Sequence, residues 1–289
     1  TALVTPFKDG AVDKKAFQDF VAWQLAEGTN GFVPCGTTGE APTLIDEEHE
    51  LLTQLCGEVV KGKAPMIVGC GSNSTRHAIE LTNKVDKAGA DAALQVIPYY
   101  NKPTQEGMYQ HFKTIHDNTS LPIVIYNVPS RTIADMSAET MIRLAQLPRI
   151  VGVKDATGDM VRPLKIKAAC GDSFMQLSGN DDTALTFLTQ GGVGCISVIS
   201  NIAPKLCAQM QKAFRDGDLK TAQAINAHLQ PMNEALFMES SPAPTKCVLS
   251  MMGKVENELR LPMVCASAKL GAYLKELLSK LNEDVRAAA

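Results

Sequence analysis

A lysine ends one of the most apolar segments of this sequence. Lys154 closes the run RIVGVK at residues 149–154. Burial disfavours the ammonium ion, and the neutral amine that remains is a nucleophile toward ketones. A lysine at the end of a strand can also extend its ammonium group into solvent. The segment therefore allows two interpretations, an imine-forming nucleophile or a solvated surface lysine.

A tyrosine ends the preceding apolar run in the same way. Tyr126 closes residues 122–126, about one strand–helix unit before Lys154. If the two runs are neighbouring strands, a phenol stands beside the amine and can relay protons during carbinolamine formation and dehydration. The alternative is a core tyrosine whose hydroxyl is satisfied at the rim of the fold.

Three further segments place polar groups directly after apolar runs. The turn 36–39 (GTTG) offers the hydroxyls of Thr37 and Thr38, and its backbone N–H groups could hold a carboxylate. Arg131 follows a Pro-Ser turn and could clamp a second carboxylate through two hydrogen bonds. An ordinary glycine turn and a solvated loop arginine explain these two features equally well. Tyr99 and Tyr100 are interpreted as interface, lid or catalytic aromatics.

Eight short apolar runs must position these residues. They are nearly continuous in Val, Ile, Leu and Ala, which is typical of parallel strands covered on both faces. The predicted strands are residues 2–5, 31–35, 66–70, 92–97, 122–126, 150–154, 174–178 and 194–198. A longer amphipathic segment follows each run. Eight such repeats predict a (β/α)8 TIM barrel, in which the polar residues above share the rim at the carboxyl ends of the strands.

Helix boundaries can be predicted at several of these repeats. Asp13 and Asp46 are expected to cap the first two helices, and Ser74 or Thr75 the third. Glycines 28 and 89 are expected to end the first and third helices. Each helix then covers one step of the barrel.

The strand pattern stops near residue 217. Helical segments follow at 219–237, 245–252 and 266–287, with Pro242, Pro244 and Pro262 expected as breakers between them. We therefore predict a catalytic barrel over residues 1–216 and a C-terminal helical region over 217–289 that packs against it.

Composition excludes several other classes of protein. The net charge is −3, from 28 Lys and Arg against 31 Asp and Glu, which argues against nucleic acid or an anionic membrane surface as a partner. No apolar stretch of about 20 residues could span a membrane. The chain opens on Thr1 rather than Met, so we expect a few natural N-terminal residues to precede it.

Eight cysteines and five histidines are present. None of the cysteines forms a C-x-x-C pair, so no metal site is expected. Most lie in apolar runs, and we interpret them as buried, reduced thiols of a cytoplasmic protein.

The polar segments together resemble a known family. The motifs are VTP at 4–6, GTTGE at 36–40, PYYNKP at 98–103, YNVPSRT at 126–132 and GVKD at 152–155. In this order they are similar to the dihydrodipicolinate synthase family of pyruvate aldolases, a superfamily that includes N-acetylneuraminate lyase. The resemblance covers essentially the whole chain.

The resemblance implies roles for particular residues. Lys154 would form an imine with pyruvate, without any separate cofactor. Thr37, Tyr126 and Tyr100 would relay protons, with Tyr100 reaching in from a neighbouring subunit. The substrate-binding residues would be Thr38 for the pyruvate carboxylate, Arg131 for the carboxylate of L-aspartate 4-semialdehyde, and Gly179 and Ile196 through backbone contacts near the imine.

It also implies a homotetramer, built as a dimer of dimers, that acts in lysine and diaminopimelate biosynthesis. The nearest alternative is another pyruvate-dependent enzyme, such as N-acetylneuraminate lyase or a keto-deoxy sugar-acid aldolase. The lyase more often carries Ser at the position of Thr37 and lacks an equivalent of Arg131. A non-catalytic binding barrel would have lost Lys154, Tyr126 or Thr37, and all three are present.

Family members often bind L-lysine as an inhibitor at a dimer interface. By position the candidate residues here are Ala41, Pro42, His49, Asn73, His77 and Tyr99. His77 stands where a sensitive enzyme often has Glu, and the loss of that carboxylate removes a partner for the ammonium group of the effector. We therefore predict weak or absent inhibition by lysine.

Overall fold

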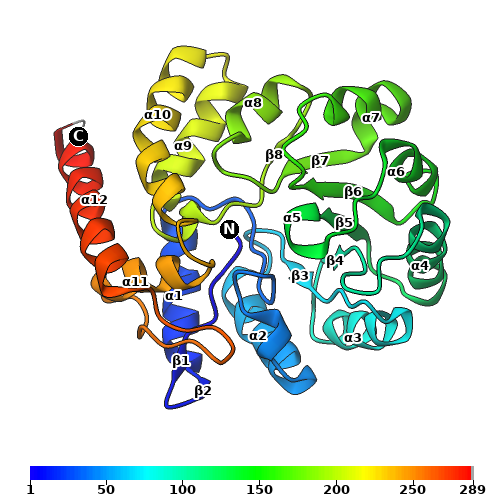
Figure 1. Ribbon diagram of the computed structural model, residues 1–289, viewed down its shortest axis with the longest axis horizontal. Helices are drawn as coiled ribbons and strands as arrows, with labels where there is room; N and C mark the ends of the chain where they lie inside the picture. The colour runs from blue at the N-terminus through cyan, green and yellow to red at the C-terminus, as the bar shows by residue number, and fades with distance from the viewer. Residues whose placement is uncertain (288–289) are drawn as a thin grey trace.

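The computed structural model describes residues 1–287, and side chains up to residue 281. Its central element is a curled sheet of six parallel strands that are neighbours in chain order (Figure 1). The strands are β3 (Ile67–Gly69), β4 (Ala92–Val96), β5 (Ile123–Asn127), β6 (Ile150–Asp155), β7 (Met175–Ser178) and β8 (Gly194–Cys195). All six coincide with predicted strands, and their common direction brings their carboxyl ends to one side.

The two remaining predicted strands, 2–5 and 31–35, are not regular strands. Only single parallel bridges form there, Ala2 with Val33 and Phe32 with Met66. Backbone hydrogen bonds nevertheless join these two segments to the two edges of the sheet. Ala2 N donates to Ser197 O at 2.9 Å, and Ile67 N donates to Phe32 O at 2.9 Å. Pro34 has no N–H to donate, which limits the ladder at this point.

Helices follow the strands along the chain and surround the sheet (Figure 1). They are α1 (Lys14–Ala26), α2 (Asp46–Val60), α3 (Thr75–Lys87), α4 (Gln105–Asn118), α6 (Ala138–Leu144), α7 (Arg162–Cys170), α8 (Ala184–Thr189) and α9 (Pro204–Arg215). The sequence did not predict the hairpin β1 (Phe7–Lys8) and β2 (Ala11–Val12) or the short helix α5 (Pro129–Thr132).

Most of the predicted helix ends are confirmed. Asp13 accepts a hydrogen bond from the N–H of Ala16 at 3.0 Å, and the Ser74 hydroxyl accepts one from the N–H of His77. Glycines 28 and 89 adopt φ of +93° and +100° just beyond α1 and α3. These are left-handed conformations that glycine reaches without steric cost.

The prediction for Asp46 was wrong. Ile45 is the N-cap of α2, and its N–H donates to the Glu48 carboxylate at 3.1 Å. Asp46 is instead the first helical residue and forms an ion pair with Lys84 of α3 at 2.8 Å. An acidic side chain in the first turn of a helix is stabilised by the helix dipole, so the sequence pattern fits both positions.

Three helices follow the last strand–helix repeat, as the sequence predicted. They are α10 (Leu219–Ala235), α11 (Ala243–Met251) and α12 (Ala268–Ala287). Pro244 is not a breaker between helices, because it lies in the first turn of α11, where a missing N–H costs no hydrogen bond. Leu229, Val248 and Leu274 from these helices share one core with Leu3 and Phe20. The core is continuous across residue 217, while the division of the chain there stays a prediction.

The two faces of the sheet have separate apolar clusters. Val124, Tyr126 and Leu94 belong to an inner cluster with Val33 and Ile196. The alternating residues Ile123, Ile125 and Val153 pack in a second cluster beneath the outer helices. Because strand side chains alternate between the faces, the residues at 124 and 126 point to the inner side.

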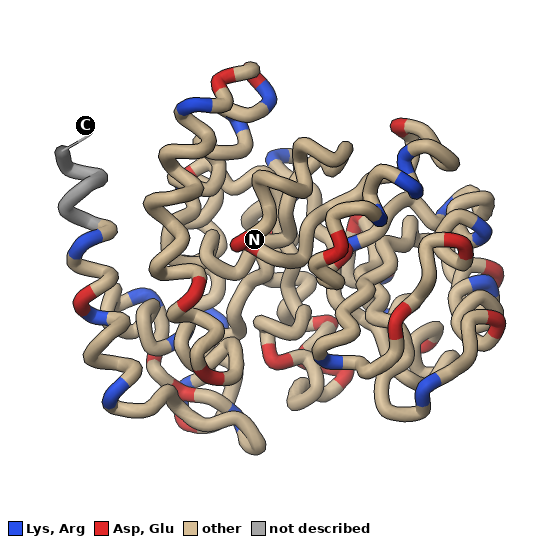
Figure 2. Tube along the Cα trace, turned by 45° about the horizontal axis from the view of Figure 1, so that its top comes forward, with Lys and Arg blue, Asp and Glu red and all other residues tan. Residues whose placement is uncertain are grey.

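Charges and thiols fit the expectations from composition in most places. Figure 2 shows Lys and Arg interspersed with Asp and Glu along the outer helices, and neither sign fills the visible face. All eight cysteines are free thiols. Cys35, Cys56, Cys70 and Cys247 are buried, but Cys265 is exposed, which the sequence did not predict.

Candidate active site

Lys154 and Tyr126 are paired across neighbouring strands. The register of β5 and β6 sets Tyr126 directly opposite Lys154, so both side chains enter the inner side of the sheet. Lys154 is 5% exposed, and its Nζ lies 4.2 Å from the centroid of the Tyr126 ring. Among the residues that the structure describes, no carboxylate forms an ion pair with this amine. The predicted neighbourhood of Lys154 and Tyr126 is therefore present.

A cavity of 570 Å³ opens above this pair. It is lined by the turn of Thr37 and Thr38, by residues at or after the carboxyl ends of β5 to β8, by the end of α10 and by the segment between α10 and α11. The lining includes Thr37, Thr38, Tyr126, Arg131, Lys154, Gly179, Asn180, Asp182, Asn233, Glu234, Phe237 and Ser241. Six of the eight residues that the sequence assigned to catalysis or substrate binding thus share one cavity.

The turn 36–41 presents backbone donors to the same cavity. The carbonyl of Gly36 accepts from the N–H of Gly39 at 3.0 Å and from that of Ala41 at 3.2 Å. Within the described part of the chain, the N–H groups of Thr37 and Thr38 donate to no acceptor. Both threonines line the cavity, so their two free N–H groups can receive an anionic oxygen.

Gly179 lies against Lys154 and requires the absence of a side chain. A Cβ at this position would lie 3.2 Å from Lys154 Cε and 2.8 Å from Ala156 Cβ. The N–H of Gly179 donates to the carbonyl of Asp155 at 2.7 Å. The glycine therefore leaves room for the lysine side chain in the cavity.

An ion pair that the sequence did not predict fixes the end of β6. Asp155 and Arg162 are both buried, and Nε of Arg162 lies 3.2 Å from Asp155 Oδ2. The other oxygen of Asp155 accepts from the N–H and the hydroxyl of Thr157, at 2.8 and 2.7 Å. The only sequence signal was the acidic residue directly after Lys154. This network orients the backbone that carries the lysine.

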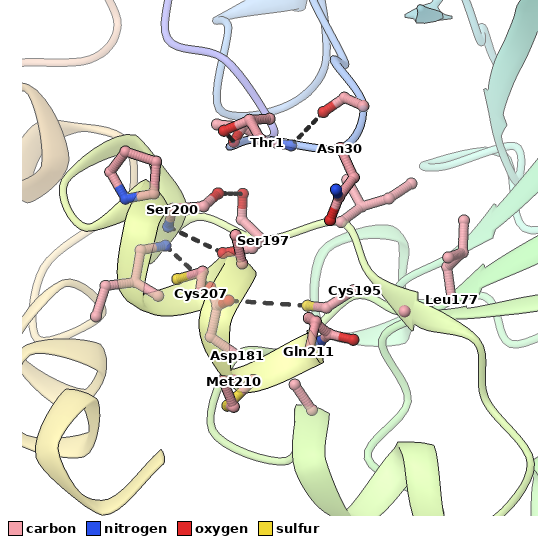
Figure 3. Close-up of a pocket in the computed structure, with 18 of the residues that line it drawn as sticks. Thr1, Asn30, Leu177, Asp181, Cys195, Ser197, Ser200, Cys207, Met210 and Gln211 are labelled. Carbon is pink, nitrogen blue, oxygen red and sulfur yellow. Dashed lines mark hydrogen bonds between the residues drawn. The ribbon is translucent and has the colours of Figure 1, made fainter. Parts of the chain in front are cut away.

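Two predicted site residues lie outside this cavity. Tyr100 is 89% exposed and has a left-handed backbone, with φ of 70°. Ile196 is buried in the inner cluster and donates its N–H to Ser178 O at 2.9 Å. Ile196 lines a different cavity, of 470 Å³, together with Thr1, Cys195 and residues of α9 (Figure 3).

The 470 Å³ cavity shares Asp181 and Asn233 with the site of Lys154. The Asp181 carboxylate accepts from the N–H groups of Val198 and Ile199 at 2.7 and 3.1 Å, and Figure 3 shows it facing Cys195. Burial raises the pKa of the Cys207 thiol beside it well above its usual range. A thiol that stays protonated is a poor nucleophile, so the chemistry belongs to the cavity of Lys154.

The residues expected to form the lysine-binding site gather around a third cavity, of 400 Å³. His49, His77 and Tyr99 line it with Ala41 and Pro42. Asn73 is adjacent, since its side-chain amide donates to the carbonyl of Tyr99 at 3.2 Å.

Thr37, Tyr126 and Arg131 line this third cavity as well as the active-site cavity, so the two adjoin. His77 Nε2 lies 3.9 Å from Asp46. Burial lowers the pKa of His49 below its ordinary value.

Among the described residues, no group of three or more His, Cys, Asp or Glu side chains could hold a metal ion. None of the described helices is long and apolar enough to cross a membrane.

Comparison with known proteins agrees with this arrangement. The chain matches the Dihydrodipicolinate synthetase family over residues 1–281. A 4-hydroxy-tetrahydrodipicolinate synthase of Rhodospirillum centenum is 59% identical over 263 residues, which cover 91% of this chain and 90% of the relative.

Solved structures align with almost the whole length of this chain. Dihydrodipicolinate synthase from Aquifex aeolicus aligns with a TM-score of 0.95 at 41% identity, over 98% of this chain and 97% of that one. The chloride-inhibited dihydrodipicolinate synthase from Acinetobacter baumannii, complexed with pyruvate, aligns with a TM-score of 0.95 at 43% identity over 97% of both chains.

A buried amine beside a phenol at the carboxyl ends of parallel strands defines the class of Schiff-base, aldolase-type lyases. Within that class, this chain belongs to the dihydrodipicolinate synthetase family. The resemblance inferred from the motifs is confirmed.

Proposed function

We propose that this chain condenses pyruvate with L-aspartate 4-semialdehyde, the reaction of a 4-hydroxy-tetrahydrodipicolinate synthase. The observation that carries the proposal is the position of Lys154 in one cavity with Tyr126, Thr37 and Thr38. Within the residues that the structure describes, this buried amine has no ion-pair partner and the N–H groups of the two threonines have no acceptor. The names of the relatives favour this reaction over that of N-acetylneuraminate lyase.

In the first step, Nζ of Lys154 attacks the ketone carbon of pyruvate. Loss of water from the carbinolamine leaves a protonated imine. This cation keeps the contact with the Tyr126 ring, whose face attracts positive charge. The Tyr126 hydroxyl moves the protons that addition and dehydration require, with Thr37 and Tyr100 as the other members of the relay.

The free N–H groups of the turn hold the pyruvate carboxylate. Thr37 and Thr38 provide two donors on one side of the cavity, which fixes the orientation of the ketone toward Lys154. Gly179 supplies space and a backbone contact near the imine, and Ile196 a further backbone contact.

The second substrate reacts with the enamine that forms when the imine loses a methyl proton. The enamine carbon attacks the aldehyde, and Arg131 at the rim receives the carboxylate of the semialdehyde. The amino group of the adduct then displaces Lys154 Nζ as the ring closes, which regenerates the free amine. No separate cofactor takes part in this sequence.

The same proposal covers the assembly. We infer a complete (β/α)8 barrel, with residues 2–5 and 31–35 as its first two strands. The hydrogen bonds that join these segments to both edges of the sheet support this inference. We further infer a cytoplasmic homotetramer, a dimer of dimers, because exposed Tyr100 needs a neighbouring subunit to reach a cavity.

The test is an assay of substrate choice. The purified protein, supplied with pyruvate, should consume L-aspartate 4-semialdehyde and leave N-acetylneuraminate intact. Cleavage of N-acetylneuraminate without consumption of the semialdehyde would contradict the proposal.

A further inference from the structure

We propose that a buried ion pair between Glu40 and Lys246 positions the Thr37–Thr38 turn and thereby sets the affinity for pyruvate. Neither residue lines the active-site cavity, so both are positioning residues rather than catalytic ones. The inference rests on the proposed function, because it assigns a purpose to the carboxylate-binding turn.

The pair is fully enclosed by the fold. Nζ of Lys246 lies 2.5 Å from Oε1 of Glu40, and the two side chains are 0% and 1% exposed. Lys246 comes from α11, whereas Glu40 ends the turn after the second predicted strand. Two charges taken out of water are costly unless they compensate each other, so each of these residues depends on its partner.

The carboxylate of Glu40 is held at both oxygens. Its Oε2 accepts from the N–H of Arg260 at 3.1 Å. The ammonium of Lys246 also donates to the carbonyl of Glu258 at 2.8 Å. The segment 258–260 and helix α11, both in the C-terminal part of the chain, therefore bind the end of the turn through hydrogen bonds and the ion pair.

An aromatic ring and a second ion pair reinforce this anchor. The Phe7 ring lies 4.2 Å from Lys246 Nζ and 4.3 Å from the Arg260 guanidinium carbon. Arg260 makes two contacts of 2.6 Å with Glu48 and donates to the carbonyl of Thr43 at 3.0 Å. The contacts of Arg260 with Thr43 and Glu48 restrain the chain that follows Glu40.

The turn needs such restraint because its backbone is strained. Cys35 and Glu40 flank it with φ of 56° and 57°, a left-handed conformation that side chains other than glycine disfavour. Glycine would relieve the strain at position 40 but could not carry the carboxylate. The hydroxyl of Thr5 donates to Gly39 O at 2.7 Å and so fixes the same turn from the N-terminal segment of the chain.

The consequence is a specific kinetic signature. If the pair holds Thr37 and Thr38 in place, its loss displaces their free N–H groups relative to Lys154. A displacement of about 1 Å at a binding group can cost up to roughly 100-fold in reactivity. The defect should appear in pyruvate binding and not in the affinity for the semialdehyde, whose carboxylate site is Arg131.

The experiment compares borohydride trapping of pyruvate on the wild-type protein and on three variants. Glu40→Gln keeps the shape of the side chain and removes its charge, and Lys246→Met removes the partner. Val248→Ala is the matched control, because Val248 is an uncharged core residue of the same helix α11. The measured quantity is the pyruvate concentration that gives half-maximal labelling of Lys154.

We expect this concentration to rise roughly 10-fold or more in Glu40→Gln and Lys246→Met. It should stay within about twofold of wild type in Val248→Ala, even if that variant unfolds at a lower temperature. A folded Glu40→Gln with the wild-type value, or an equal rise in Val248→Ala, would overturn the positioning role. A wild-type protein that traps no pyruvate would instead refute the proposed function.

Hydrogen exchange on the wild-type protein provides a test that does not depend on whether the variants fold. Pyruvate should slow amide exchange in residues 36–41 and also in residues 254–262, although the latter do not line the cavity. Protection limited to residues 36–41 would show that the turn is not coupled to the C-terminal anchor.

Discussion

At the scale of single residues, the site depends on one contact between an amine and an aromatic ring. Nζ of Lys154 lies over the Tyr126 ring in a buried cavity that leaves it without an ion-pair partner in the described chain. The ring face attracts positive charge, so it favours the cationic imine that forms from this amine.

Tyr126→Phe separates the hydroxyl of this tyrosine from its ring. The contact with Lys154 should persist, because phenylalanine keeps the ring, while the proposed proton relay would lose its central member. We expect kcat to fall roughly 100-fold or more, with little change in the thermal unfolding temperature. Steady-state kinetics and a melting curve measure the two effects.

Tyr109→Phe is the matched control, since Tyr109 of α4 packs against Arg143 and does not line the cavity. A Tyr126→Phe enzyme with the wild-type kcat would exclude the relay.

Gly179→Ala tests the space beside the nucleophile. The new methyl group would press on Lys154 Cε at 3.2 Å and on Ala156 Cβ at 2.8 Å, so the lysine must move. We expect kcat/KM for pyruvate to fall about 10- to 100-fold. Gly57→Ala on helix α2 is the control, because its nearest neighbour lies 3.6 Å away and alanine favours a helix. Equal activities of the two variants would show that Lys154 tolerates the displacement.

The sequence predicted that Lys154, Tyr126 and the turn of Thr37 and Thr38 lie together, and the structure places them in one cavity. They stand out in the sequence because each follows or ends an apolar run. Asp155 with Arg162, and Glu40 with Lys246, were missed. Each of these pairs joins segments whose contact depends on the tertiary fold, and charged residues in isolation resemble solvated ones.

At the scale of secondary-structure elements, the register of β5 and β6 creates the site. A shift of one residue would turn either Lys154 or Tyr126 to the outer face. The period of the apolar runs predicted all six regular strands of the sheet. It could not show that residues 2–5 and 31–35 form only single bridges, because that depends on which N–H groups meet a partner in space.

The packing of α3 against α4 should make stability depend on pH. Burial lowers the pKa of His111 to about 4 from 6.5, and its Nδ1 lies 2.9 Å from the hydroxyl of Thr75. The folded state binds a proton on His111 less well than the unfolded chain does. The stability that comes from burying the neutral imidazole is therefore fully present above pH 6.5 and is lost as the pH falls toward 4. Between pH 7 and pH 5 we expect a loss of about 2 kcal/mol from this group.

Urea unfolding of wild type and His111→Asn at both pH values, at one protein concentration, isolates that contribution. Asparagine retains a polar atom near the position of Nδ1 and does not titrate. The variant should therefore lose less stability than wild type when the pH is lowered. Identical losses in the two proteins would show that His111 does not titrate differently on unfolding.

At the scale of the whole molecule, the cavity combines segments far apart in the sequence. Asn233 of α10, and Phe237 and Ser241 of the segment that follows it, reach the cavity from the C-terminal region, which the sequence identified only as helical. No local motif marks these residues, because their role follows from how α10 packs beside α9 and α8. The C-terminal helices thus complete the site that the strands begin.

The exposure of Tyr100 leads to a prediction about subunit assembly. Tyr100 is exposed in the single chain and lies outside the cavity, so its proposed role in the relay requires a neighbouring subunit. Tyr100→Ala and Lys154→Ala should each be nearly inactive alone. Subunits of the two variants, mixed in equal amounts and allowed to exchange, should regain activity in up to about a quarter of their sites. No recovery in verified mixed oligomers would place Tyr100 outside its neighbour's site.

The adjoining cavity, lined by His49 and His77, is where we predict weak or absent inhibition by L-lysine. His77 already lies between Asp46 and Glu80, at 3.9 and 4.0 Å, and does not supply the carboxylate that an effector ammonium group would need. We expect added L-lysine to change the initial rate little. Full inhibition at micromolar lysine would contradict this prediction.

The most direct test of the central claim is borohydride reduction in the presence of pyruvate, followed by peptide mass spectrometry. Reduction of the imine fixes the three-carbon unit on the nitrogen that formed it. We expect a single modified residue, Lys154, and no stable adduct in Lys154→Ala. Pyruvate fixed on another lysine, or on none, would contradict the role of Lys154 as the imine-forming residue.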